Sequence, residues 1–133
     1  MANSFAGTWS YRSLINDPDL STEFNDLRFG MGTLVLQESE PGRITGTLGG
    51  TGWSLELSGT TTPGDPTKVR FQGRGVINGE TWVYDYLGFV VPDWPNGVDQ
   101  VDAIVGTIVR TEPHSGGQAE AGFVASWYAV RQD

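Results

Sequence analysis

The stretch RFQGRGVINGETWVYDYL, residues Arg70–Leu87, decides the fold of this chain. Asn78-Gly79 stands between two alternating runs, and this dipeptide favours a two-residue type I′ hairpin because both central residues of that turn need positive φ. The turn sets the register and places Gly75 opposite Trp82. One face of the hairpin then carries large rings opposite glycines, an arrangement typical of a barrel interior where large and small residues alternate.

The rest of the chain has the same character. Nineteen glycines and seven prolines divide it into short runs rich in Thr, Val and aromatic residues, and no window shows a sustained helical period. The turn-forming residues between these runs predict eight strands, at about 5–15, 27–37, 43–48, 53–59, 67–77, 80–91, 100–111 and 121–131. We therefore expect an all-β chain that forms one domain over residues 1–133, a single antiparallel up-and-down eight-stranded β-barrel.

The amino-acid composition excludes several classes of partner and cofactor from our expectations. Sixteen acidic against eight basic residues give a net charge of −8, which repels phosphate backbones, so we expect no nucleic-acid partner. With one histidine and no cysteine, we expect no metal site and no cofactor. The opening MANSFAGTW lacks the features of a signal peptide, and no apolar run reaches the length of a membrane span. We expect a cytoplasmic protein without a membrane partner.

Two short signatures give the predicted barrel a family resemblance. Gly7-Thr8-Trp9 heads the first strand, and SWYAVRQD places Arg131 at the end of the last. This chain thereby resembles the calycin superfamily of lipocalins, avidins and fatty-acid-binding proteins, which pack a basic residue across the N-terminal Trp at the closed base. Connectivity agrees, because strand 1 begins and strand 8 ends at the same end of such a barrel. We expect Trp9 and Arg131 to form a structural plug.

The resemblance to avidin in particular is partial. GRITGTLGG, residues 42–50, echoes a Gly-x-x-Thr-Gly-Thr string of avidin. A tyrosine that binds the biotin ureido oxygen follows that string in avidins, whereas Leu48 stands here. Biotin is therefore not the expected ligand.

Alternation of the loops assigns each to one end of the barrel. The base, defined by Trp9, receives loops 38–42, 60–66 and 92–99, and Trp94 is expected to cover its floor. The mouth receives loops 16–26, 49–52, 78–79 and 112–120. The first of these is expected to contain a short helical turn after Asn16 or Asp17 and to act as a lid with Leu20 and Phe24 on its apolar side. His114 lies on a polar Gly-rich mouth loop, where exposure is the ordinary state.

The lumen and mouth hold the candidate ligand-binding residues. They are aromatic, hydroxyl-bearing or otherwise able to contact a small molecule: Tyr11, Ser13, Phe29, Met31, Phe71, Trp82, Tyr84, Tyr86, Trp127 and His114. A mostly apolar cavity with a few placed polar groups is the usual form of a small-molecule site. The same rings would also fill a solid core, as in small eight-stranded barrels. The sequence leaves both interpretations open.

Three functions remain. The first is a barrel that binds a small hydrophobic or aromatic molecule. The second is a barrel enzyme of the cyclase or isomerase type, resembling allene oxide cyclase, in which Tyr84, Tyr86 or His114 moves a proton. The third is a structural module that forms a homo-oligomer through an apolar outer-wall patch made by Val83, Leu87 and the outward residues of the strand at 100–111. No catalytic residue is assigned.

Overall fold

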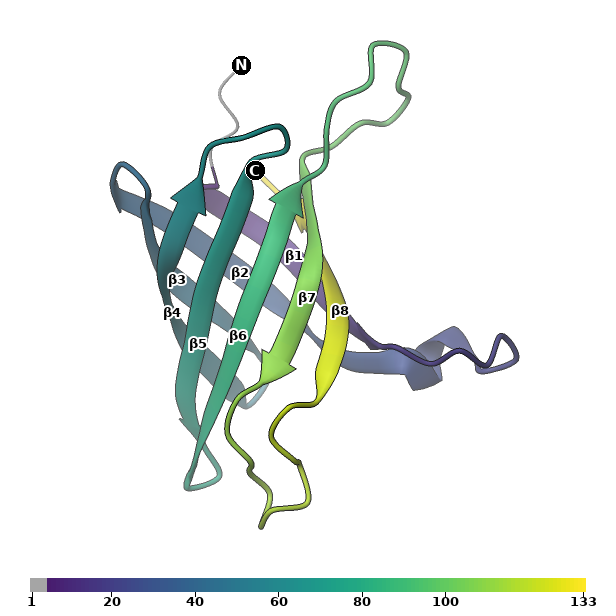
Figure 1. Cartoon of the computed structure of the whole chain (residues 1–133), viewed down its shortest axis with the longest axis vertical. Coiled ribbons are helices and arrows are strands. Elements are labelled where there is room, and N and C mark those ends of the chain that lie inside the picture. Colours follow the sequence, from purple (N-terminus) through teal and green to yellow (C-terminus); the bar gives the residue numbers. More distant parts are fainter. Residues whose placement is uncertain (1–4) are drawn as a thin grey trace.

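A computed structural model describes residues 5–133 as a closed barrel with strand order β1-β2-β3-β4-β5-β6-β7-β8 (Figure 1). The strands are antiparallel to their neighbours and β8 pairs with β1, which removes every sheet edge. The prediction of an all-β, up-and-down eight-stranded barrel is confirmed. The strands are β1 (Gly7–Ile15), β2 (Arg28–Glu40), β3 (Arg43–Gly50), β4 (Trp53–Thr62), β5 (Lys68–Ile77), β6 (Glu80–Val90), β7 (Ala103–Arg110) and β8 (Val124–Arg131).

The hairpin between β5 and β6 has the predicted register. Asn78 and Gly79 have φ values of 52° and 79°, as a type I′ turn requires. Gly75 pairs with Trp82 and Gly73 with Tyr84. The nearest atoms that a Cβ would meet at these two glycines belong to β4, so they serve strand packing as much as the rings opposite them.

A different glycine makes room for an aromatic ring. A Cβ on Gly88 would lie 2.7 Å from Cζ2 of Trp127 and 2.8 Å from Cγ2 of Ile104, distances far inside van der Waals contact. Trp127 therefore crosses the middle of the barrel over Gly88, where it is 2% exposed. Its indole Nε1 donates a hydrogen bond of 2.9 Å to the carbonyl of Thr107.

A β-bulge in β2 changes which side chains face the lumen. Ser13 pairs with Gly30 whereas Leu14 pairs with Arg28, so Phe29 is the extra residue. Phe29 packs against the core, and the regular alternation that follows turns Met31 outward, where it is 51% exposed. The expectation that Met31 lines the lumen is therefore wrong, because the bulge interrupts the two-residue period that linked it to Phe29.

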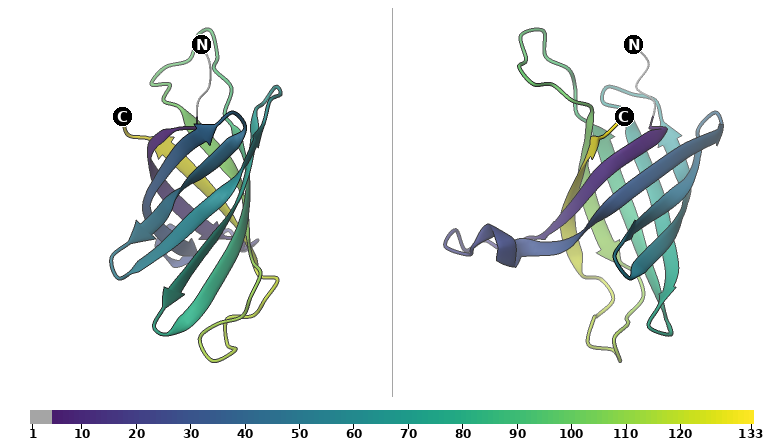
Figure 2. Two further views of the ribbon diagram at one scale, coloured as in Figure 1. Left: turned by 90° about the vertical axis from the view of Figure 1, so that its left-hand side faces the viewer. Right: turned by 180° about the vertical axis from the view of Figure 1, so that it is seen from behind.

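The segments that follow β1 and β6 both extend away from the barrel (Figures 1 and 2). The first joins β1 to β2 and contains one 3₁₀ turn, η1 (Phe24–Leu27). Leu20 is fully exposed and Phe24 is 85% exposed. The predicted lid is therefore wrong: Asp17 accepts hydrogen bonds from the Asp19 amide and the Thr22 hydroxyl, an Asx turn that replaces the expected helical turn and directs the segment outward.

The second projecting segment joins β6 to β7 and carries Trp94. The side chain of Gln100 closes this loop by accepting from the Trp94 amide and donating to the Trp94 carbonyl, at 2.6 Å and 2.8 Å. Trp94 is 64% exposed, so it does not cover the floor of the base as expected. The loop is held by its own hydrogen bonds and stands clear of the barrel end.

Candidate ligand-binding site

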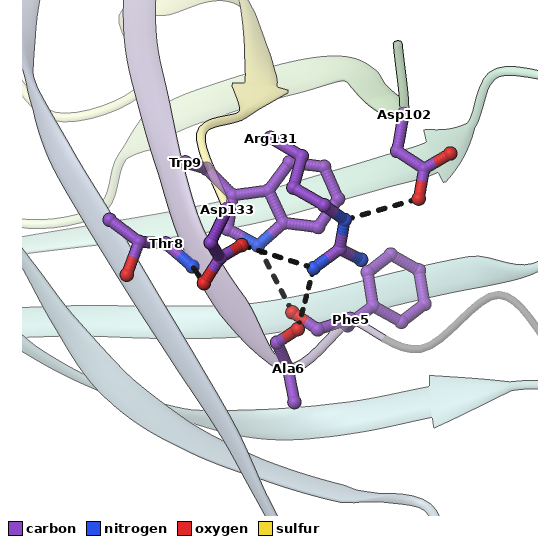
Figure 3. Close-up of polar contacts among 7 residues, drawn as sticks. All are labelled: Phe5, Ala6, Thr8, Trp9, Asp102, Arg131 and Asp133. Atoms are coloured by element: carbon purple, nitrogen blue, oxygen red, sulfur yellow. Dashed lines mark hydrogen bonds and ion pairs between the residues drawn. The ribbon is translucent and has the colours of Figure 1, made fainter.

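The base of the barrel is closed by the contact predicted between Trp9 and Arg131 (Figure 3). The two residues are paired across β1 and β8, and the guanidinium carbon lies 4.4 Å from the indole centroid. Trp9 is 1% exposed, and its Nε1 donates to the carbonyl of Phe5 at 3.1 Å. Phe5, which the sequence analysis did not assign, is itself buried and adds a second ring to the closed end.

Carboxylates hold Arg131 in that position. Its Nε lies 3.1 Å from Oδ2 of Asp102, and its Nη1 lies 3.6 Å from Oδ1 of Asp133. Nη1 also donates to the carbonyl of Ala6 at 2.8 Å. The cation is therefore stacked, neutralised and hydrogen-bonded at the base, which is the combination that makes an arginine–indole contact stabilising.

A cavity of about 290 Å³ occupies the mouth half of the lumen. Its lining includes Gly52 and Ile77, which lie beside the β3–β4 and β5–β6 turns, so the cavity lies at the end opposite Trp9. The lining is Tyr11, Ser13, Phe29, Gly30, Gly52, Trp53, Leu55, Ile77, Trp82, Tyr84, Tyr86 and Ile108. Every one of these residues is uncharged.

Aromatic packing forms the floor beneath this cavity. Phe71 stacks on Tyr86 with ring centroids 4.7 Å apart, and Trp127 meets Tyr11 at 5.8 Å. Phe71 and Trp127 are buried but are not among the lining residues. The two interpretations left open by the sequence therefore apply to different halves of the lumen, a solid core toward the base and a cavity toward the mouth.

The phenol hydroxyls of Tyr11 and Tyr86, at the floor of the cavity, remain protonated. Burial raises the pKa of Tyr11 to about 12. Burial also raises the pKa of Tyr86 well above its usual value, and Tyr11 beside it adds to the effect. Both phenols are therefore neutral at physiological pH. Ser13 is 1% exposed and donates weakly, at 3.4 Å, to the carbonyl of Gly30.

His114 is buried against two lining residues, Trp82 and Tyr84, contrary to the exposure expected for a Gly-rich loop. It is 5% exposed, and its ring stacks on Trp82 with centroids 3.7 Å apart and planes 7° apart. Its Nε2 lies 2.9 Å from the hydroxyl of Tyr84. The ring stack and the hydrogen bond draw the imidazole inward, while the glycines after it leave the rest of the segment in solvent.

Arg110 and Phe123 pack against the lining residues Phe29 and Tyr84 from behind the cavity and were missed by the sequence analysis. The guanidinium of Arg110 lies 5.3 Å to 5.7 Å from the rings of Phe123, Phe29 and Tyr84. It donates to the Tyr84 hydroxyl at 3.3 Å and to the Glu120 carbonyl at 3.2 Å. The alternation of side chains along β7 places Arg110 on the inner face with Ile108. This alternation is the sequence feature that could have identified Arg110 as an inward-facing residue.

Trp53 is the aromatic lining residue that the sequence analysis missed. It begins β4, where Trp53, Leu55 and Leu57 alternate inward. Within the described chain, Nε1 of Trp82 is the one buried side-chain nitrogen or oxygen without a hydrogen-bond partner. The cavity thus has indole and phenol donors on its wall and no charged group in its lining.

One member of the predicted outer-wall patch is buried. Val83 is only 1% exposed, although its strand parity points it outward. A groove farther along the wall is lined partly by Phe89, Val105 and Tyr128. Phe89 and Val105 are exposed.

Comparison of the chain with protein-family models, curated proteins and solved structures finds no match. In residues 5–133, no helix has the length and apolar character needed to span a membrane. The same residues contain no group of three or more histidine or acidic side chains arranged to hold a metal ion. The site is therefore interpreted from its own geometry.

Proposed function

We propose that this protein binds a small, uncharged organic molecule, apolar or aromatic in its body, in the cavity at the mouth of a calycin-like barrel. The cavity of about 290 Å³ carries this proposal. Its volume lies at the lower end of the range of roughly 300–1,000 Å³ that is usual for ligand pockets. The ligand is therefore small enough to fit above the floor made by Tyr11 and Tyr86.

The chemistry of the lining supports an uncharged ligand. A charged ligand group would lose its hydration without gaining an opposite charge from the lining residues, at a cost of several kcal/mol or more. The phenols of Tyr11 and Tyr86 and the hydroxyl of Ser13 offer neutral hydrogen bonds instead. One or two polar atoms on an aromatic or aliphatic body match this lining.

The first test fills the cavity. A Cβ on Gly30, a lining residue, would meet only the Ser13 hydroxyl, at 3.3 Å. Gly30→Leu therefore places an isobutyl group in the cavity without a backbone clash. Native mass spectrometry of the purified protein identifies a retained ligand, and calorimetry with phenol measures binding by a simple uncharged aromatic probe.

We expect Gly30→Leu to weaken phenol binding by about tenfold or more, equivalent to about 1.4 kcal/mol. Met31→Leu is the matched control, because the neighbouring residue faces solvent, and it should bind phenol as the wild type does. Equal binding by wild type and Gly30→Leu, or failure of the wild type to bind phenol and a panel of similar neutral molecules, contradicts the proposal.

An enzyme that transfers a proton is the second candidate function. The observation that favours it is the position of the Tyr84 hydroxyl, which lies between the Arg110 guanidinium and the His114 imidazole at the cavity wall. A cation and a base on one phenol are suited to general acid–base chemistry. Turnover of 5-nitrobenzisoxazole, which reports abstraction of a carbon-bound proton, tests this candidate. Loss of that turnover in Tyr84→Phe supports it, and its absence in the wild type counts against it.

A further inference from the structure

The hydroxyl group of Tyr84 has two partners, and one of them can only donate hydrogen bonds. Nε of Arg110 lies 3.3 Å away and Nε2 of His114 lies 2.9 Å away. A guanidinium donates hydrogen bonds and cannot accept them, so the Tyr84 oxygen accepts from Arg110. Within residues 5–133, no other partner of this hydroxyl is present. Nε2 of His114 is therefore the acceptor within reach of its hydrogen.

A Tyr84 hydrogen directed to His114 corresponds to one tautomer of the imidazole. When Nε2 accepts that hydrogen, the neutral ring carries its own hydrogen on Nδ1. Nδ1 lies 2.9 Å from the hydroxyl of Ser115, which can accept it. The chain of hydrogen bonds runs from Arg110 through Tyr84 and His114 to Ser115, from the cavity wall to the solvent-exposed rim.

The imidazole is held firmly in this chain. Its ring lies flat on Trp82, and the backbones of His114 and Ala119 exchange hydrogen bonds of 3.0 Å and 3.1 Å. Ser115 and the two glycines after it adopt positive φ, which makes the tight turn that brings those backbones together. Among residues 111–122, only His114 is buried. One side chain therefore connects this rim segment to the cavity wall.

Two charged groups face His114. Arg110 comes from β7, and Glu80 from β6 accepts a hydrogen bond from the Gly116 amide at 3.3 Å. Burial is the main cause that lowers the pKa of His114 from its ordinary value near 6.5, and the Arg110 charge lowers it further while Glu80 opposes both. The ring is therefore neutral at pH 7, as the hydrogen-bond arrangement requires.

We propose that His114 sets the hydrogen-bond direction of Tyr84, so that uptake of one proton at His114 Nε2 converts Tyr84 from an acceptor into a donor toward the cavity. This inference rests on the proposed function, in which the cavity binds an uncharged molecule. With neutral His114, the hydrogen of Tyr84 is engaged, and only a lone pair is left for a ligand. With protonated His114, the Tyr84 oxygen accepts from both neighbours, and its hydrogen is free for a ligand.

The ligand preference of the cavity should therefore change with pH. Neutral His114 favours ligands with a hydroxyl or amine hydrogen, and protonated His114 favours ligands with a carbonyl oxygen. Phenol and acetophenone are suitable probes, because both are small uncharged aromatics and only phenol is a donor. Calorimetry at about pH 8 and about pH 5 brackets the ordinary titration range of histidine.

We expect the ratio of phenol to acetophenone affinity to fall by about fivefold between the two pH values, the size of one net hydrogen bond. His114→Gln keeps hydrogen-bonding capacity without titrating in this range, so its ratio should be constant. Tyr84→Phe should show the same constancy. A wild-type ratio that does not change while both probes bind overturns the inference, whereas failure of both probes to bind contradicts the proposed function.

The ligand-free test is decisive for the hydrogen-bond arrangement itself. His114 is the only histidine in the chain, so ¹⁵N NMR of the imidazole reports its tautomer without ambiguity. The expected result at about pH 8 is a protonated Nδ1 and an unprotonated Nε2, with the second proton added to Nε2 at a pH below the ordinary pKa near 6.5. A neutral ring protonated at Nε2 overturns the inference, whether or not any probe binds.

Discussion

Each end of the barrel places an arginine against aromatic rings, but the two arginines differ in their charge partners. At the base, Arg131 lies over the ring of Trp9 and is neutralised by Asp102 and Asp133. At the mouth, Arg110 lies among three rings, and in the described chain it forms no ion pair. The base is closed by a neutralised stack, whereas the mouth keeps an unneutralised cation beside a cavity.

The difference indicates which end of the barrel contributes to stability and which end can change its hydrogen bonds to a ligand. Trp9 fills its end of the lumen with an indole that is 1% exposed. Tyr84 at the other end shares its hydroxyl with a cation and an imidazole that change the hydrogen bonds it can offer. Stability should therefore depend mainly on the base, and ligand preference mainly on the mouth.

Removal of the Trp9 indole at the base should have the largest effect on stability. Trp9→Ala leaves a cavity at the closed end and removes the surface on which Arg131 stacks. We expect the free energy of unfolding to fall by about 3–5 kcal/mol, the usual cost of a large-to-small aromatic substitution in a core. Urea denaturation measures it, and a loss below about 1 kcal/mol would show that the base does not hold the barrel closed.

The two arginines offer a matched comparison. Arg131→Met removes a stacked cation with its hydrogen bonds and should cost about 1–2 kcal/mol of stability. Arg110→Met keeps apolar contact with the three rings and removes a cation that has no carboxylate to neutralise it, so it should cost less. Urea denaturation of both variants checks the order. An equal or larger loss for Arg110→Met contradicts the contrast between the ends.

The His114 anchor should have a smaller, pH-dependent effect. At about pH 8, His114→Gln should reduce the free energy of unfolding by about 1 kcal/mol, since it removes the stack on Trp82 and alters one buried hydrogen bond. The folded chain lowers the pKa of His114, so the unfolded chain takes up the proton first. The wild-type advantage is complete above the ordinary pKa near 6.5 and declines as the pH falls through the lowered folded value.

Urea midpoints of the wild type and His114→Gln, measured across that range, give the difference directly. The wild type should approach the variant on the acid side. A difference that is constant with pH, or that grows in acid, would mean that the folded chain does not disfavour protonated His114.

The smallest effect is expected at the projecting loop beside the base. Trp94 is 64% exposed, and its loop is closed by backbone contacts to Gln100 rather than by the indole. Trp94→Ser should therefore change stability by no more than about 0.5 kcal/mol, as surface substitutions usually do. A thermal melt measures this. A loss comparable to that of Trp9→Ala would place Trp94 in the structure of the base after all.

Local chemistry explains what the sequence predicted well. Asn78-Gly79 specifies its turn from two residues, and the hairpin register follows from the turn. The meeting of Trp9 and Arg131 was implied by the calycin resemblance, and the order of the strands brings the two residues to the same end.

Features that depend on non-local contacts were not predictable in the same way. The bulge at Phe29 separates it from Met31 and arises where β1 and β2 lose register. Burial of His114 depends on Trp82 and Tyr84, which are about thirty residues away in the chain. Leu20, Phe24 and Trp94 are apolar yet exposed, and hydrophobicity alone therefore assigned them incorrectly to covering roles.

The tryptophan indole signals provide the most direct test of a cavity at one end and a closed base at the other. Trp53 and Trp82 line the cavity, Trp127 lies beneath it, and Trp9 and Trp94 belong to the base and its projecting loop. In a ¹⁵N NMR titration with phenol, we predict saturable shifts of the Trp53 and Trp82 indole signals, with Trp9 and Trp94 unchanged. Shifts confined to Trp9 or Trp94, or no saturable shift of any indole signal, would contradict the account.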